Sequence, residues 1–329
     1  SMTSTLKVRR SPSSLGAFST ITASTTSPLA LLSTDTVALG GFRGIIADLL
    51  WIRVADRQEE RCFFEVVQLA DWITKLEPQS ADVWAYHAWN MAYNISVVFP
   101  QSADRWRWVE NGIRLLRDEG MKYNPGDPHL PWELGWIYQH KIGGIWDEAG
   151  PYYRLMLAQQ MNGLLGGGNL QTVARDPERL RALRETTRLD PERMAEIDSK
   201  FGPLDWRVPE SHAVYWACES IRDSGTNVTM NSDRMLYLNL IESVRHGRLV
   251  FDPARRLYVR GPNLGLIPGT IRALEEVSNR QRREAVQDVY ESFLDEALLY
   301  LYAFQRPEEL GRMWTLRKAR FPSTEMAGG

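Results

Sequence analysis

The stretch PWELGWIYQHKIGGIWDEAGPYY at residues 131–153 decides the fold. Leucine, isoleucine and aromatic side chains recur in it at helical spacing on both sides of Gly143-Gly144. We therefore expect one helix over about 130–140 and a second over about 146–161, with the two glycines in the turn between them. Two helices joined by so short a link form the repeating pair of helical solenoids.

Similar helical segments extend over most of the chain on either side of this pair. Phe42, Ile45, Ile46, Leu49 and Leu50, for example, fall at positions i, i+3, i+4, i+7 and i+8 of one helix face. Proline or glycine separates many of the segments, because neither residue continues a helix well. Further helices are expected at about 42–60, 63–76, 81–97, 104–122, 176–190, 191–200, 210–222, 232–245, 268–280, 281–304 and 307–320.

One short segment has the pattern of strands. Leu249-Val250-Phe251 and Leu257-Tyr258-Val259 flank the turn-forming sequence at 252–255, which predicts a β-hairpin near 249–259. The chain as a whole is therefore predicted to be all-α, an irregular solenoid of helix pairs with at most one small β-hairpin.

The order Leu134-Gly135, Tyr138, Ala149 and Tyr153 resembles the unit of tetratricopeptide repeat proteins. In that unit, small residues stand where two antiparallel helices cross closely. The resemblance covers about 37–162 and again about 290–322, and it implies a fold that holds other proteins. The spacing between the helix-ending prolines exceeds the usual repeat length, so we expect irregular units.

Six longer runs resemble a little-characterised bacterial family of such tetratricopeptide-like helical proteins. They are VALGGFRG at 37–44, ADLLWIR at 47–53, QLADWI at 68–73, WNMAYNIS at 89–96, GPLDWR at 202–207 and HAVYWA at 212–217. Many members carry an N-terminal membrane anchor, so the resemblance implies attachment to the bacterial cytoplasmic membrane. A Ser/Thr-rich segment stands at that place here, so the anchor is missing or was removed, and this chain itself is expected to be soluble.

Composition divides the chain into four predicted parts. Residues 1–36 form a Ser/Thr-rich tail, either flexible or a degenerate targeting segment, and they are too polar to span a bilayer. Residues 37–162 hold the tetratricopeptide-like helices, and 163–208 form a Gly-rich, charged connector with short helices. Residues 209–329 form a C-terminal helical region with the hairpin and a final tetratricopeptide-like helix pair.

Charge and motifs exclude several function classes. The net charge is −2, so no strong field attracts nucleic acid. Cys62 and Cys218 are the only cysteines, and their helical, apolar surroundings favour two free thiols. The sequence has no zinc-ligand spacing, no nucleophile-elbow motif and no complete phosphate-binding loop. We therefore expect no metal, no cofactor and no catalytic residue.

Aromatic residues indicate a binding groove in the first half of the chain, where most of the 12 tryptophans lie. The first helices of a helix-pair solenoid form a concave surface that receives an extended peptide or a partner helix. Some of these rings are expected to pack in the core and others to line the groove, with asparagine and arginine holding the peptide backbone or a carboxylate. The groove candidates are Arg53, Trp84, Trp89, Asn90, Tyr93, Asn94, Trp132 and Trp136.

A second group of polar residues gives an alternative. Asp205 could orient His212, and Arg207 could bind an anion, with Tyr215 beside them, as in a small-ligand site or an enzyme. Equally, Asp205 can pair with Arg207 while His212 packs against the preceding helices.

The leading interpretation of the sequence is a scaffold in a multiprotein, envelope-associated bacterial assembly. Its expected partner is a protein or peptide, and self-association into a homo-oligomer is left open. The alternative is a small-ligand-binding protein or a hydrolase-like enzyme. Architecture alone does not decide between them.

Overall fold

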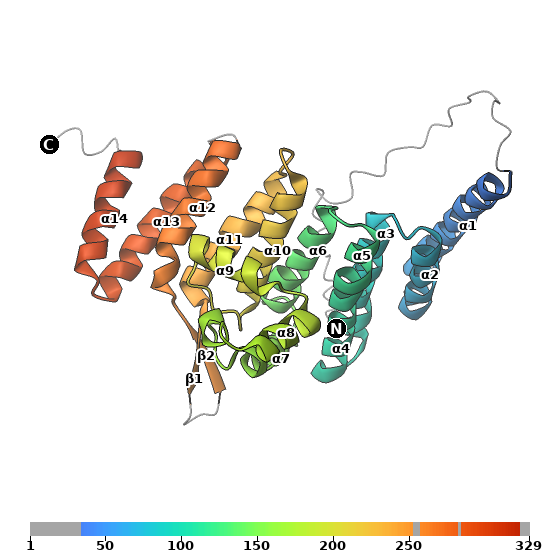
Figure 1. The fold of residues 1–329 in the computed structure, drawn as a ribbon, viewed down its shortest axis with the longest axis horizontal. Coiled ribbons are helices and arrows are strands. Elements are labelled where there is room, and N and C mark those ends of the chain that lie inside the picture. Colours follow the sequence, from blue (N-terminus) through green and yellow to red (C-terminus); the bar gives the residue numbers. More distant parts are fainter. Residues whose placement is uncertain (1–33, 253–256, 282–283, 323–329) are drawn as a thin grey trace, which may run out of the picture. The chain divides into compact units, whose positions relative to one another are not determined.

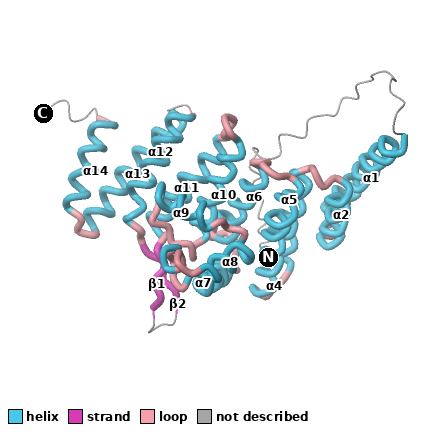
Figure 2. The backbone as a smooth tube through the Cα atoms, viewed as in Figure 1, coloured by secondary structure: helices cyan, strands magenta, loops and turns pink. Residues whose placement is uncertain are grey.

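The computed structural model describes residues 34–252, 257–281 and 284–322, and these are mainly helical (Figures 1 and 2). This confirms the predicted all-α class. The chain divides into two compact units, Ser1–Phe42 and Arg43–Gly329. Residues 1–33, most of the predicted tail, lie outside the described residues.

Three helices in the first half of the chain contain π-helical segments that hydropathy did not indicate. The helices are α1 (Thr34–Glu59), α2 (Phe63–Leu76), α3 (Ala81–Trp89), α4 (Ser102–Arg114), α5 (Met121–Tyr123), α6 (His129–Trp136) and α7 (Gly150–Leu165). The π-helical segments are η1 (Asn90–Ile95) after α3, η3 (Leu115–Gly120) after α4 and η4 (Ile137–Ile142) after α6. Each one continues the preceding helix without a break, so the backbone pairing changes while the run of apolar residues does not.

Helices in the second half begin, in several cases, with a proline, whose fixed φ suits the first turn. They are α8 (Pro177–Thr187), α9 (Pro191–Phe201), α10 (Pro209–Ser224), α11 (Met230–His246), α12 (Ile267–Arg280), α13 (Glu284–Ala303) and α14 (Pro307–Arg320). The predicted hairpin is present as β1 (Arg248–Asp252) and β2 (Leu257–Gly261), an antiparallel pair with Val250 opposite Val259. Among the described residues, these two strands form the only sheet.

Helix packing follows the chain in the second half. Helices α10 to α14 each contact the next one in sequence, and Figure 1 shows them side by side. Earlier in the chain, α2 packs on α3, and α3 packs on both α4 and α6. One large core joins residues from α3 through α14, and a small second core holds α1 against α2 and α3.

The expected neighbours of Gly135 are wrong. We expected Gly135 to lie closest to Ala149 and Tyr153, but α6 packs mainly on α10. A Cβ placed on Gly135 would overlap the Met235 sulfur and come within 3.3 Å of the Trp216 Cβ, both from later helices. After a seven-residue loop, α7 packs on η4, the second part of the same helix, and also on α4 and α8.

None of the helices in the described residues combines the length and the apolar character needed to cross a membrane.

Candidate partner-binding surface

Six partly stacked rings from two neighbouring helices form what we call the aromatic strip. Its members are Trp89 and Tyr93 from α3 and η1, and His129, Trp132, Trp136 and His140 from α6 and η4. Most successive members along each helix are four residues apart, so their side chains share one helix face. Trp89 is exposed and the other five are partly buried, so the strip reaches the protein surface.

The strip crosses from one helix to the other at two residues in π-helical segments. Trp89 stacks on Tyr93 with ring centroids 5.6 Å apart, and Tyr93 meets His140 at 5.7 Å. His140 in turn stacks on Trp136 at 4.9 Å, and Trp136 stacks on Trp132 at 5.7 Å. These separations are those of favourable aromatic pairs. π-Helical turns are frequent at functional sites, and here they place the rings that join the two helices.

Tyr93 and His140 of the strip remain in their neutral forms, whereas the hydrogen bond to Glu133 raises the pKa of His129. Burial and the nearby Glu133 hold the pKa of Tyr93 well above its ordinary value, so its hydroxyl stays protonated. Burial, with Lys141, lowers the pKa of His140, so its ring is neutral at pH 7. The Tyr93 hydroxyl and the Trp132 indole nitrogen are buried without a hydrogen-bond partner. Leaving such buried donors unpaired costs free energy.

Sequence reasoning named four of the six members of the strip. Trp89, Tyr93, Trp132 and Trp136 were groove candidates, whereas His129 and His140 were not. Spacing could have identified both histidines. His129 stands three residues before Trp132, and His140 stands four residues after Trp136. An imidazole ring at such a position stacks like any other planar ring.

Two other groove candidates lie inside the fold. Trp84 is buried, donates its indole N–H to the Pro78 carbonyl at 2.8 Å and stacks on Tyr123. Asn90 is also buried, and its amide donates to the Tyr86 carbonyl at 2.9 Å.

The last two candidates keep some access to solvent. Asn94 donates to the Asn90 side chain at 2.7 Å and is partly buried. Arg53 is exposed on α1, which carries no member of the strip. The groove candidates therefore do not form one surface.

An open hollow of about 600 Å³ lies between the end of η4, α11 and α13. Trp146, which is 81% exposed, and Ile145 stand at one side of it, and Leu238 contributes a third apolar group. Its carboxylates are Glu210, Glu242, Asp288 and Glu296, and its one basic residue is Arg245. Arg245 donates to both oxygens of Glu296 at 2.6 Å and to Glu242 at 3.3 Å, and the buried Glu210 pairs with Arg260 at 2.7 Å. Asp288 is therefore the lining carboxylate without a basic partner among the described residues.

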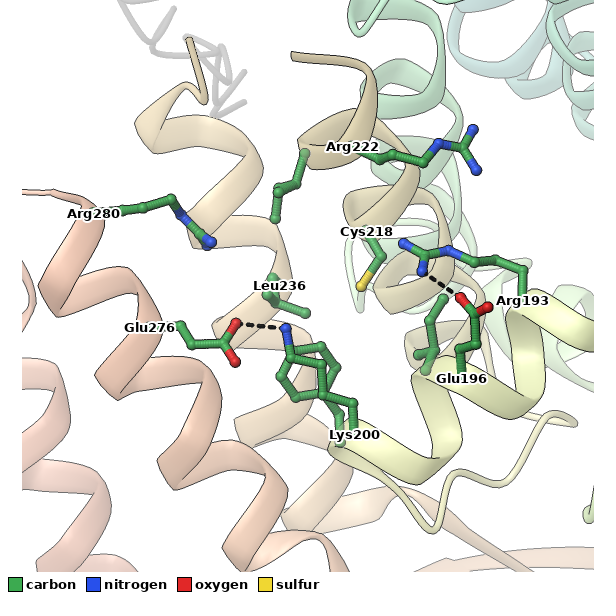
Figure 3. A pocket seen from close by; sticks show the side chains of 11 residues that line it. Arg193, Glu196, Lys200, Cys218, Arg222, Leu236, Glu276 and Arg280 are labelled. Carbon is green, nitrogen blue, oxygen red and sulfur yellow. Dashed lines mark hydrogen bonds and ion pairs between the residues drawn. The ribbon is translucent and has the colours of Figure 1, made fainter. Parts of the chain in front are cut away.

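A second, smaller hollow of about 300 Å³ lies between α9, α10 and α12 (Figure 3). Several basic side chains line it, as in an anion-binding site, but each of them already pairs with a carboxylate. Arg193 pairs with Glu196 at 2.8 Å, and Lys200 pairs with Glu276 at 2.7 Å. Arg222 and Arg280 likewise pair with carboxylates of α10 and α11. The Lys200 and Arg280 pairs join neighbouring helices, and all four pairs together leave little free positive charge for a ligand.

Cys218 at the bottom of that hollow is a free, buried thiol. Burial raises its pKa to about 12, so the thiolate that would act as a nucleophile does not form near neutral pH.

Asp205 and Arg207, two residues of the alternative site, link two parts of the backbone through hydrogen bonds. The Asp205 carboxylate accepts two hydrogen bonds from the Arg207 guanidinium, at 2.8 and 2.7 Å, and one from the Leu249 backbone N–H at 3.0 Å. Arg207 also donates to the Leu249 carbonyl at 2.6 Å. These contacts join the loop after α9 to strand β1.

His212 and Tyr215 make separate contacts deeper in the fold. His212 is buried, and one ring nitrogen contacts the Trp206 carbonyl at 3.0 Å. Burial lowers the pKa of His212 to about 4. The Tyr215 hydroxyl accepts a hydrogen bond from the Asp190 backbone N–H at 3.1 Å. Neither side chain lines either hollow.

Comparison of the chain with protein-family models, with curated proteins and with solved structures gave no match. The arguments for function therefore rest on the chain's own residues.

Proposed function

We propose that this protein is a binding scaffold of the tetratricopeptide-like kind, which holds a segment of a partner protein on the aromatic strip. The run of stacked, partly exposed rings on α3, η1, α6 and η4 carries this proposal. Rigid aromatic side chains supply large contact area at low entropic cost, and they are enriched at binding hot spots. Attachment to a bacterial envelope assembly belongs to the same proposal and rests on the sequence resemblance.

The hollow between η4, α11 and α13 favours a partner segment with basic and apolar side chains. Its apolar side at Trp146 and Leu238 suits an aliphatic stem, and the carboxylate of Asp288 suits an ammonium or guanidinium group. Gln139 lines this hollow, and its neighbour His140 belongs to the strip. One extended segment could therefore contact both surfaces.

The rival proposal, a small-ligand site or enzyme at Asp205, Arg207 and His212, has weaker support. The hydrogen-bonding groups of Asp205 and Arg207 are already engaged with each other and with β1. A catalytic base needs a proton to take within reach of a substrate position. Among the described contacts, the hydrogen-bond partner of His212 is a backbone carbonyl, and its ring stacks on Tyr138.

Selection of peptides tests the scaffold proposal directly. A random peptide library is panned on the immobilised protein, and the enriched peptides are measured by titration calorimetry. We expect sequences that combine basic and apolar residues. Replacing both Trp132 and Trp136 by serine should weaken binding by at least about tenfold, as loss of hot-spot rings does.

A matched control keeps this result interpretable. Trp314→Ser removes an exposed tryptophan from α14, away from the strip, and should leave the affinity unchanged. Melting curves of both variants establish that they fold. Equal weakening by both variants, or enrichment of no common sequence, would count against the scaffold.

A further inference from the structure

Helix α1 has two apolar faces, and only one of them is covered in the described structure. On the inner face, Ala47 and Val54 are buried, and Val54 packs with Leu50 and Trp51 in the small core shared with α2 and α3. The outer face is exposed, and its residues are Ile45 (58%), Leu49 (61%) and Ile52 (62%). With 100° per residue, these three lie on the opposite side of the helix from Ala47 and Val54. A surface helix in a monomer needs only the first face.

The spacing of the outer residues is that of a coiled-coil seam. Ile45, Leu49 and Ile52 are separated by four and then three residues, which are the intervals between positions d, a and d of a heptad. In sequence, Phe42 extends the same spacing by three residues towards the N-terminus. The next a and d positions are Asp56 and Glu59, so the apolar seam spans Phe42 to Ile52 and ends there.

The charges beside the seam are complementary between two parallel copies. With Leu49 at position a, Asp48 falls at position g and Arg53 at position e of the following heptad. In a parallel, in-register pair, g of one helix faces this e of the other helix, so Asp48 meets Arg53 twice by symmetry. An antiparallel pair would instead bring each charge towards its own copy.

We propose that a second copy of this chain covers the outer face of α1, and that the two α1 helices form a short parallel coiled coil. The seam lies outside the aromatic strip, so this self-association is independent of the proposed partner binding. It is expected to be concentration-dependent, because the seam is short.

A lipid surface fits this face less well. Helices that lie on anionic membranes carry an excess of lysine and arginine on their polar side. From Arg43 to Glu59, α1 has Arg43, Arg53 and Arg57 against Asp48, Asp56 and Glu59. The charges balance, which favours a protein partner with the same alternation.

Sedimentation velocity of the full chain, at concentrations from about 1 to about 100 µM, tests the proposal. We expect a monomer–dimer equilibrium that Leu49→Asp shifts at least about tenfold towards monomer, since it places a charge in the seam. Leu299→Asp changes an exposed leucine on α13 and should leave the equilibrium unchanged. At a concentration where the wild type is monomeric, neither change should alter the melting temperature much, because both side chains are exposed.

A charge swap distinguishes the parallel arrangement. Asp48→Arg and Arg53→Asp should each weaken the dimer, and the double variant should restore it. A wild-type chain that stays monomeric throughout the concentration range would overturn the proposal. So would a dimer that Leu49→Asp leaves intact, or one that the double swap does not restore. Flotation with vesicles of mixed zwitterionic and anionic lipid, lost in Leu49→Asp without any dimer, would assign the face to a membrane instead.

Discussion

Gly135 shows how one residue can be important for a reason other than the expected one. It lies in the middle of the contact between α6, α10 and α11, where Met235 and Trp216 leave no room for a Cβ. We expect Gly135→Leu to destabilise the protein by about 1–3 kcal/mol or more, because overpacking displaces buried side chains. Urea unfolding measures this change. The flexible Met235 side chain can adjust to a smaller group, so Gly135→Ala should cost less.

Substitution of Gly163 should have the opposite effect on stability in the same urea-unfolding experiment. It is exposed in α7, and nothing lies within 4 Å of the place where its Cβ would be. Gly163→Ala should therefore stabilise the protein by up to about 1 kcal/mol, as expected from helix propensity alone. If Gly135→Leu also stabilises the protein, the close packing of α6 on α10 and α11 is not present in solution.

Elements bounded by proline or by a polar turn were the most predictable. The bounds of α2 and α14 were predicted to the residue. Pro78 follows the end of α2, Pro307 begins α14 and Pro322 follows its end. Helix 146–161 was predicted four residues early at both ends, because the aromatic residue Trp146 continues the apolar pattern into the loop. The π-helical segments were not predicted, since hydrophobic periodicity does not report the backbone pairing.

The binding surface was only partly predictable, because it depends on which helices pack on one another in the tertiary structure. Helical spacing placed Trp132 with Trp136 and Trp89 with Tyr93 on common faces, but it could not tell which faces other helices cover. Trp84 is buried because Tyr123, far along the chain, stacks on it. The hollow near Trp146 combines residues from η4, α11 and α13, whose proximity no local pattern encodes.

The link between the loop after α9 and strand β1 can be tested by removing Asp205. This carboxylate is buried and pairs with Arg207, so Asp205→Ala leaves the guanidinium without its partner. We expect a loss of about 3–5 kcal/mol in unfolding free energy, as for other broken buried pairs. Asp104→Ala, which removes a more exposed carboxylate 3.4 Å from Arg107, should cost about 1 kcal/mol or less. An Asp205→Ala variant of unchanged stability would revive the rival ligand site.

At the scale of the whole molecule, two buried histidines make the fold sensitive to acid. Burial lowers the pKa of both His87 and His212 to about 4, below the ordinary value of 6.5. Between these values the unfolded chain binds more protons than the folded one, so stability falls as the pH falls. His129 acts in the opposite direction, because its hydrogen bond to Glu133 raises its pKa. The net slope therefore combines several groups, and single variants are needed to separate them.

His87 is the better of the two for this separation, because its removal breaks no hydrogen bond. The side chain is buried and neither ring nitrogen has a partner, although Asp71 and Lys75 exert opposing effects on its charge. An apolar side chain should fit there at little cost or with a gain in stability at neutral pH, since no buried polar group is left unpaired. We expect His87→Leu to be at least as stable as the wild type at about pH 7.

The decisive measurement for His87 is the difference between two pH profiles. From about pH 7 to about pH 5, a histidine with these folded and unfolded pKa values removes about 2 kcal/mol of stability. Urea unfolding of His87→Leu over this range should therefore lose about 2 kcal/mol less than the wild type. His246→Leu, at an exposed position on α11, controls for removal of a histidine as such. Parallel profiles for wild type and His87→Leu would mean that His87 is not held neutral in the fold, and that the packing of α3 around it is looser than described.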